Sequence, residues 1–159
     1  MEITDLIALD AVVPALRVSS KKQALQELAK RASELIGPDV VSDREIFEVL
    51  LERERLGTTG VGSGIAIPHG KLDKLSGLHG LFAKLDRGVD FEAIDEQPVD
   101  LIFLLLAPET AGADHLKALA RVSRLLRDKA TCEKLRGAAS DEALYAILTS
   151  AGASSSHAA

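Results

Sequence analysis

His69 is the side chain best suited to chemistry, and it lies in the segment GIAIPHGK. The proline before it has a fixed φ, and the glycine after it lets another backbone or a ligand come close, so we expect the imidazole to be held still and reachable. A neutral imidazole, with an unperturbed pKa of about 6.5, is a nitrogen nucleophile that attacks phosphorus without a separate base. The local sequence alone favours an ordinary loop histidine equally.

Arg53 is a second candidate, because it falls on the apolar stripe of a predicted helix. It follows Ile46, Val49 and Leu50 at the helical spacings of seven, four and three residues. An inward-facing guanidinium needs an anionic partner, since an unpaired buried charge is very costly. A protein carboxylate is one candidate partner. A phosphoryl group on His69 is the other, because the helix ends just before the loop that leads there and an arginine fork suits phosphoryl oxygens.

The remaining histidines are less informative. His115 lies in the first turn of a predicted helix, where free amide groups and the helix dipole favour nearby negative charge, so it is able to donate a hydrogen bond to phosphoryl oxygens. An exposed polar residue near a helix cap is the alternative, and the pattern itself does not bring His115 to His69. His79 lies between Leu78 and Gly80 in a β segment, which indicates a structural role.

Other motifs in the chain are weaker. The segment GTTGVGSG resembles a phosphate-binding glycine loop, but it lacks the Gly-Lys-Ser/Thr ending and has its helix and strand in the reverse order. The histidines and the single cysteine, Cys132, show none of the pair spacings of zinc ligands. Ser63, His69 and Asp73 lie near one another without a nucleophile-elbow sequence. We therefore expect no metal and no cofactor.

Capping and periodicity predict the helices around the candidate residues. Ser20 begins a capping box for a helix that ends at Gly37, and Ser42 begins another for the helix that carries Arg53 and ends at Gly57. A third helix follows Pro108, with Leu116, Leu119, Ala120 and Leu126 on one stripe and Thr110 or Asp114 as its N-cap, and a last helix covers about 141–148.

Three β segments are expected between the second and third helices. The first, 64–67, is ended by Pro68, so that His69 lies at a strand end. The others are 78–85 and 99–106, and the last is apolar throughout, which is typical of a central strand buried on both faces. This order of elements predicts an α/β (α+β) fold in which helices cover a mixed sheet.

Composition limits the classes of function. The chain has 159 residues, 47% of them apolar, a formal charge of −5 and 3% aromatic residues. We expect a single domain over 1–150, a disordered tail over 151–159, no nucleic-acid partner and no membrane insertion. With one cysteine and no export signal in the first residues, a cytoplasmic location is expected.

The motif around His69 resembles the enzyme IIA proteins of the phosphotransferase system, mannitol/fructose class, and most closely their free-standing nitrogen-related branch. The resemblance covers most of the chain through the segments LLERERLGTTGVGSGIAIPHGK, FEAIDEQPVDLIFLLLAPE and DHLKALARVSRLLRDK. It implies a mixed sheet flanked by helices. It also implies that His69 is phosphorylated on Nε2 and that Arg53 and His115 stabilise the phosphoryl group.

The same resemblance implies the partners. The donor is a phosphohistidine of an HPr-type carrier protein, and the targets are sensor kinases or potassium transport systems that respond to the phosphorylation state. Arg53, His115 and amide groups of the glycine-rich loop are expected to stabilise the transferring group without Mg²⁺. A sugar-uptake enzyme IIA that passes phosphate to a separate IIB protein, and a binding module without phosphoryl transfer, are the alternatives.

Overall fold

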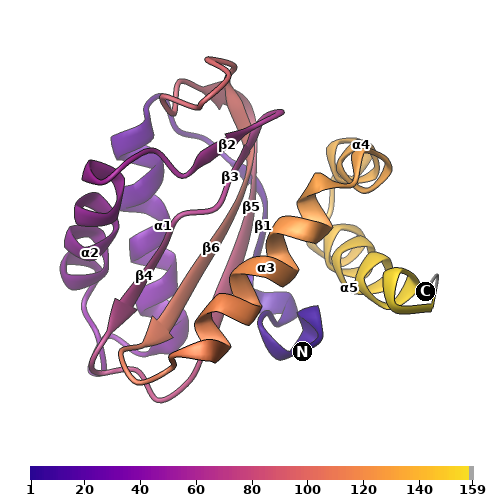
Figure 1. Ribbon diagram of the computed structural model, residues 1–159. Helices are drawn as coiled ribbons and strands as arrows, with labels where there is room; N and C mark the ends of the chain where they lie inside the picture. Colours follow the sequence, from indigo (N-terminus) through magenta and orange to yellow (C-terminus); the bar gives the residue numbers. More distant parts are fainter. Residues whose placement is uncertain (158–159) are drawn as a thin grey trace.

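The computed structural model describes residues 1–157 as a mixed sheet between two helical layers (Figure 1). The strands are β1 (Val12–Leu16), β2 (Gly60–Gly62), β3 (Ile65–Ala66), β4 (His69–Leu72), β5 (His79–Val89) and β6 (Val99–Pro108). The helices are α1 (Lys21–Ile36), α2 (Asp43–Arg55), α3 (Ala113–Arg127), α4 (Lys129–Gly137) and α5 (Asp141–His157), and short 3₁₀ turns cover Ile3–Asp5 and Leu9–Ala11. The predicted fold class is confirmed.

The apolar strand β6 lies at the centre of the sheet. It pairs antiparallel with β5 on one side and parallel with β3 and β4 on the other, while β1 and β2 form the two ends of the order β1-β5-β6-β3-β2. Helices α1 and α2 cover one face of the sheet, and α3 and α5 lie on the other, as Figure 1 shows. Side chains of β6 therefore enter both cores, as predicted for a strand buried on two faces.

Pro68 lies between two short strands, so the first strand ends before it as predicted, but the sequence did not predict the strand that follows. Ala66 pairs with Ile102 in β3, and His69 pairs with Leu105 in β4, so both short strands follow the same side of β6. Proline lacks the amide hydrogen needed for the ladder, but its carbonyl still accepts a hydrogen bond from the amide of Leu105 at 3.0 Å. His69 consequently begins a strand.

Helices α1 and α2 begin and end where the sequence predicted. The Ser20 hydroxyl accepts a hydrogen bond from the Gln23 amide at the start of α1, and Ser42 and Glu45 form the capping box of α2. Gly57 follows α2 with a φ of +146°, a conformation that side chains rarely adopt.

Several elements were missed or misplaced. Strand β1 was not predicted because it contains Pro14, which is tolerated since β1 is an edge strand that pairs only with β5. Strand β2 and the short helix α4 were also missed. The N-cap of α3 is Gly112, with φ of +54°, and neither Thr110 nor Asp114 caps that helix.

The last helix is longer than the prediction of 141–148. The backbone of α5 continues to His157, through residues 151–157 of the segment predicted as a disordered tail. Residues 158–159 of that predicted tail lie outside the described residues. Across the described part of the chain, no helix combines the length and apolarity needed to span a bilayer.

Candidate functional site

His69 is held in one tautomer by its neighbours. Its Nδ1 lies 2.9 Å from the carbonyl oxygen of Ile67, and its Nε2 lies 3.2 Å from Nε of Arg53. A carbonyl only accepts and a guanidinium only donates, so the hydrogen of a neutral ring must be on Nδ1. The lone pair therefore lies on Nε2, which is the nitrogen able to act as a nucleophile.

Arg53 reaches His69 from the last turn of α2. Its Nη1 donates to the carbonyl oxygen of Gly57 at 2.9 Å, which fixes the guanidinium beside the ring. Among the residues whose side chains the structure describes, no carboxylate forms an ion pair with Arg53. Of the sequence interpretations, the protein carboxylate partner is therefore wrong.

His115 lies beside His69, on α3 at the opposite side of the site from α2. The centroids of the two imidazole rings are 5.7 Å apart, with an angle of 51° between the ring planes. His115 is buried, with 6% of its surface exposed, and its Nδ1 has no hydrogen-bond partner in the described structure. A buried polar atom without a partner is costly, so this nitrogen suits a ligand with hydrogen-bonding oxygens.

A glycine after His69 allows α2 to lie this close. A Cβ atom on Gly70 would come within 2.4 Å of Cγ1 of Val49, a side chain of α2 one turn before Arg53. The sequence predicted that another backbone or a ligand comes close to this glycine. The group that comes close is instead a side chain of helix α2. Because Val49 is β-branched and stiff, a larger residue at position 70 would move α2 and the guanidinium of Arg53 with it.

The electrostatic surroundings favour neutral histidines. Burial lowers the pKa of His69 below its usual value, and the charge of Arg53 lowers it further, against the opposing effects of the Ile67 carbonyl and the Glu54 carboxylate. Burial also lowers the pKa of His115, with help from His69 and Lys71. Near neutral pH both rings are uncharged, which leaves the Nε2 lone pair of His69 available.

The glycine-rich segment before β3 forms a tight hairpin. Gly62 and Gly64 have φ of +105° and +80°, and the segment pairs as strands β2 and β3. The Gly60 amide donates to the Thr58 hydroxyl, and the Ser63 amide donates to Asp95. Both amides are thus already bound within the protein, and the expectation that this loop offers free amides to a phosphoryl group is wrong for these two.

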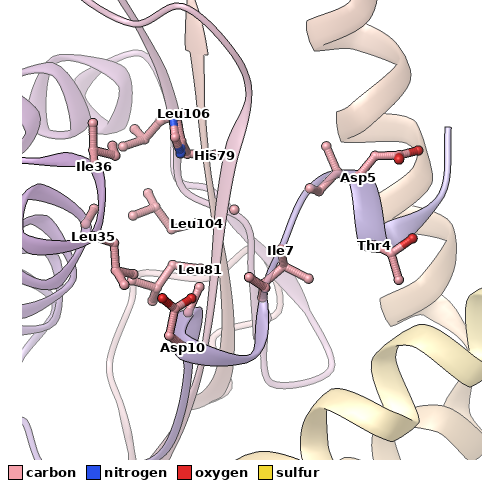
Figure 2. A pocket seen from close by; sticks show the side chains of 15 residues that line it. Thr4, Asp5, Ile7, Asp10, Leu35, Ile36, His79, Leu81, Leu104 and Leu106 are labelled. Atoms are coloured by element: carbon pink, nitrogen blue, oxygen red, sulfur yellow. The ribbon is translucent and has the colours of Figure 1, made fainter.

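His79 lies apart from this site. It faces a cavity of about 260 Å³ between the end of α1 and the N-terminal segment, where Figure 2 shows it beside Leu106 and Ile36. Burial lowers its pKa. Among the described residues, no group of three or more histidine, cysteine or acidic side chains is arranged to hold a metal ion.

Most of the chain matches a known family. The sequence model described as "Phosphoenolpyruvate-dependent sugar phosphotransferase system, EIIA 2" matches residues 5–151. The chain belongs to this family. A Bradyrhizobium diazoefficiens relative named nitrogen regulatory protein is 64% identical over 148 residues, which cover 93% of this chain and 95% of the relative. A protein of the same name from Escherichia coli K12 is 40% identical over 151 residues, covering 94% and 90% of the two chains.

Solved structures of EIIA proteins share the fold. The nitrogen regulatory protein IIA-Ntr from Neisseria meningitidis superposes with a TM-score of 0.84 at 36% identity, covering 92% of this chain and 99% of that one. The mannitol IIA protein from Escherichia coli has a TM-score of 0.72 at 19% identity, covering 89% and 97% of the two chains. This EIIA chain is thus a component of a phosphotransferase system, and it is most similar to nitrogen regulatory proteins among the relatives described here.

Sequence reasoning missed the backbone groups of this EIIA site. The carbonyls of Ile67 and Gly57, which hold His69 and Arg53, have no signature in side-chain types. Lys71, whose charge lowers the pKa of His115, was also missed. It directly follows Gly70 in the motif, and this closeness to His69 in the sequence could have indicated its role.

Proposed function

We propose that this EIIA chain accepts a phosphoryl group on Nε2 of His69 and that its phosphorylation state regulates nitrogen or potassium metabolism. The observation that carries the proposal is the hydrogen bond from Nδ1 of His69 to the Ile67 carbonyl, because it leaves the lone pair of the neutral ring on Nε2. The donor is a phosphohistidine on an HPr-type carrier protein.

The transfer exchanges one phosphorus–nitrogen bond for another. Nε2 of His69 attacks phosphorus in line, the bond from phosphorus to the donor imidazole breaks, and its electron pair returns to the donor nitrogen. The hydrogen on Nδ1 of His69 stays in place, so no proton has to move. The His69 ring gains positive charge in this step, and the carbonyl dipole of Ile67 stabilises it.

Arg53 and His115 stabilise the negative charge of the phosphoryl group in the transition state. The transition state is loose and gathers negative charge on the equatorial oxygens of the phosphoryl group. Arg53 releases Nε2 and turns its donors to those oxygens while Gly57 keeps the guanidinium in place, and the unpartnered Nδ1 of His115 donates a further hydrogen bond.

Exposed leucines near the site suit a protein donor. Leu56, next to the carbonyl that holds Arg53, is 85% exposed, and Leu116, next to His115, is 67% exposed. The fully buried core of a protein interface is more apolar than its rim, and exposed leucines are side chains that such a core can bury. A carrier that docks on these side chains brings its phosphohistidine to His69.

Regulation follows from the charge that the reaction adds. A phosphoryl group brings a charge of about −2 to a site flanked by exposed leucines, which disfavours one partner and favours another. Sensor kinases and potassium transport systems are the proposed targets, and the names of the nitrogen regulatory relatives support regulation over sugar uptake.

A sugar-uptake function is the second candidate. A Haloferax volcanii relative named PTS system fructose-specific EIIA component is 43% identical over 109 residues, covering 68% of this chain and 71% of the relative. In that case the phosphoryl group on His69 would pass to a separate IIB protein. The chemistry at His69 is the same, and only the acceptor differs.

The test is phosphorylation with purified components. The wild type, His69→Ala and His79→Ala are incubated with phosphoenolpyruvate, enzyme I and an HPr-type carrier, and the intact mass is followed. We expect one acid-labile phosphoryl group on the wild type and on His79→Ala, and none on His69→Ala. A labelled His69→Ala protein would refute the site, and an unlabelled wild type would favour a binding module without transfer chemistry.

A further inference from the structure

The carboxylate of Glu54 is buried beside the site without touching His69. It follows Arg53 in α2, its side chain is 6% exposed, and it forms an ion pair with Lys21 at 2.9 Å. Its Oε1 also accepts a hydrogen bond from the Thr59 amide at 3.0 Å, and its Oε2 accepts one from the Thr59 hydroxyl. Both oxygens are thus bound to Thr59.

Thr59 connects this carboxylate to His69 through the backbone. The carbonyl oxygen of Thr59 accepts a hydrogen bond from the Ile67 amide at 3.0 Å. The carbonyl of Ile67 then lies 2.9 Å from Nδ1 of His69. The carboxylate therefore holds Thr59, Thr59 holds Ile67, and Ile67 sets the tautomer of the nucleophile.

We propose that Glu54 is a positioning residue that keeps the Ile67 carbonyl on Nδ1 of His69 and so keeps Nε2 free for phosphoryl transfer. The inference rests on the proposed function of His69. An ion pair with Lys21 alone would leave an oxygen of the carboxylate free, whereas here both oxygens hold Thr59, whose carbonyl binds the Ile67 amide.

The charge of Glu54 acts in the same direction as the geometry. The carboxylate favours the positively charged form of His69 and opposes the lowering of its pKa. The imidazole becomes positively charged when phosphorus bonds to Nε2. A negative charge held in place by Thr59 therefore helps the step that the hydrogen bonds prepare.

The neighbours of Thr59 in the loop make hydrogen bonds that do not involve Glu54. The Thr58 hydroxyl donates to the carbonyl of Phe91, and the Gly60 carbonyl accepts from the amide of Ile94 at 3.1 Å. These bonds remain when Glu54 is replaced, and Lys21 still has Glu92 at 3.7 Å and the ring of Phe91 at 4.9 Å. Glu54→Met is therefore a suitable variant, since it keeps the volume and strands no charge.

The control is Glu52→Met on the same helix. Glu52 is 69% exposed and pairs with Arg55, so this variant makes the same change of charge without touching the loop. The first readout is the ¹⁵N spectrum of the His69 imidazole above its pKa, which distinguishes a hydrogen on Nδ1 from one on Nε2. The second is the rate of phosphorylation as a function of carrier concentration.

For Glu54→Met we expect a mixture of His69 tautomers and a rate at saturating carrier that falls about 10- to 100-fold, because small displacements of reacting groups are costly. The KM for the carrier stays unchanged, because the exposed leucines are untouched. Glu52→Met keeps the wild-type tautomer and rate. A folded Glu54→Met protein with the wild-type tautomer and rate would overturn the proposal.

Thr59 provides an independent pair of variants. Thr59→Val removes the hydroxyl that donates to Glu54 and keeps the shape, while Thr59→Ser restores the hydroxyl. We expect Thr59→Val to shift the tautomer and Thr59→Ser to rescue it, and equal spectra for the two would contradict the relay. The spectra need no phosphoryl donor. An unphosphorylated wild type would thus refute the proposed function while the relay is still tested.

Discussion

A histidine offers two nitrogens, and the residues around His69 place the hydrogen on Nδ1 and the lone pair on Nε2. The Ile67 carbonyl binds Nδ1, and the guanidinium of Arg53 lies on Nε2 as a donor that can move to phosphoryl oxygens. His115 adds a ring nitrogen that lacks a partner in the described structure. These contacts are the basis of the proposal that a phosphoryl group bonds to Nε2.

The positive charge of Arg53 is predicted to speed phosphorylation of His69, whereas the charge of the neighbouring exposed Arg55 is not. Arg53→Ala should slow phosphorylation about a hundredfold, the loss seen when a single donor to a developing charge is removed. Arg55→Ala is the control, because Arg55 is exposed and pairs with Glu52. The rate with a phosphorylated carrier is measured for both variants, and equal rates would exclude Arg53 from the reaction.

The rate should depend on pH through His69. Because burial and Arg53 lower the pKa of His69, the ring stays neutral below its usual pKa of about 6.5, and the rate should fall only at a lower pH. In Arg53→Ala the pKa should rise, since a lowering charge is lost. An NMR titration of His69 measures both values, and a lower pKa in the variant would contradict this account.

Sequence reasoning reached these side chains to different extents. Helical spacing predicted the inward face of Arg53, and its hydrogen bond to His69 agrees with that prediction. His115 was brought to His69 only by family resemblance, because residues 46 positions apart share no local pattern. The carbonyls of Ile67 and Gly57 could not be predicted, since every residue has a carbonyl and only the fold decides where it points.

At the scale of elements, the site depends on the contact between α2 and β4. Gly70 has no side chain to collide with Val49 of α2. The helix therefore lies against the strand, and Arg53 reaches His69. The parallel pairing of β4 with β6 holds the strand from its other side.

A methyl group at this contact should disturb both the fold and the reaction. Gly70→Ala is expected to lower the free energy of unfolding by about 1–3 kcal/mol, the usual cost of overpacking, and to slow phosphorylation by moving Arg53. Gly77→Ala is the matched control, because a Cβ there meets nothing within 4 Å. Urea unfolding and the phosphorylation rate are measured together. A Gly70→Ala protein with wild-type values in both would show that α2 need not lie so close.

The elements themselves were predictable where local signals were strong. The capping serines of α1 and α2 and the apolar run of β6 gave correct assignments. Strand β1 was missed because Pro14 argues against a strand unless the strand is known to lie at an edge, and edges are a property of the sheet. Strand β4 was missed for the same reason, because only the fold shows that β6 pairs with residues on both sides of Pro68.

At the scale of the whole molecule, stability should depend on histidine protonation. Burial lowers the pKa of His69, His79 and His115 in the folded chain, while unfolding returns each to about 6.5. The unfolded chain therefore binds more protons below that pH. The stability should be constant with respect to these groups above about pH 6.5 and should fall as the pH drops through the lowered values.

His79 allows a test that leaves the candidate site intact. His79→Gln removes one titrating group from the cavity of Figure 2, so the fall in stability as the pH drops below about 6.5 should be smaller than in the wild type. Urea unfolding at several pH values measures the difference. An equal or steeper fall in the variant would contradict the burial effect on His79.

The central claim is that phosphorus bonds to Nε2 of His69 while Nδ1 keeps its hydrogen. The most direct measurement is the ¹⁵N and ³¹P NMR spectrum of the protein phosphorylated by an HPr-type carrier, with histidine labelled by ¹⁵N. We predict a single phosphorus coupled to Nε2 of His69 and a hydrogen on Nδ1 that is protected by the Ile67 carbonyl. A phosphoryl group on Nδ1, or on another residue, would contradict the account.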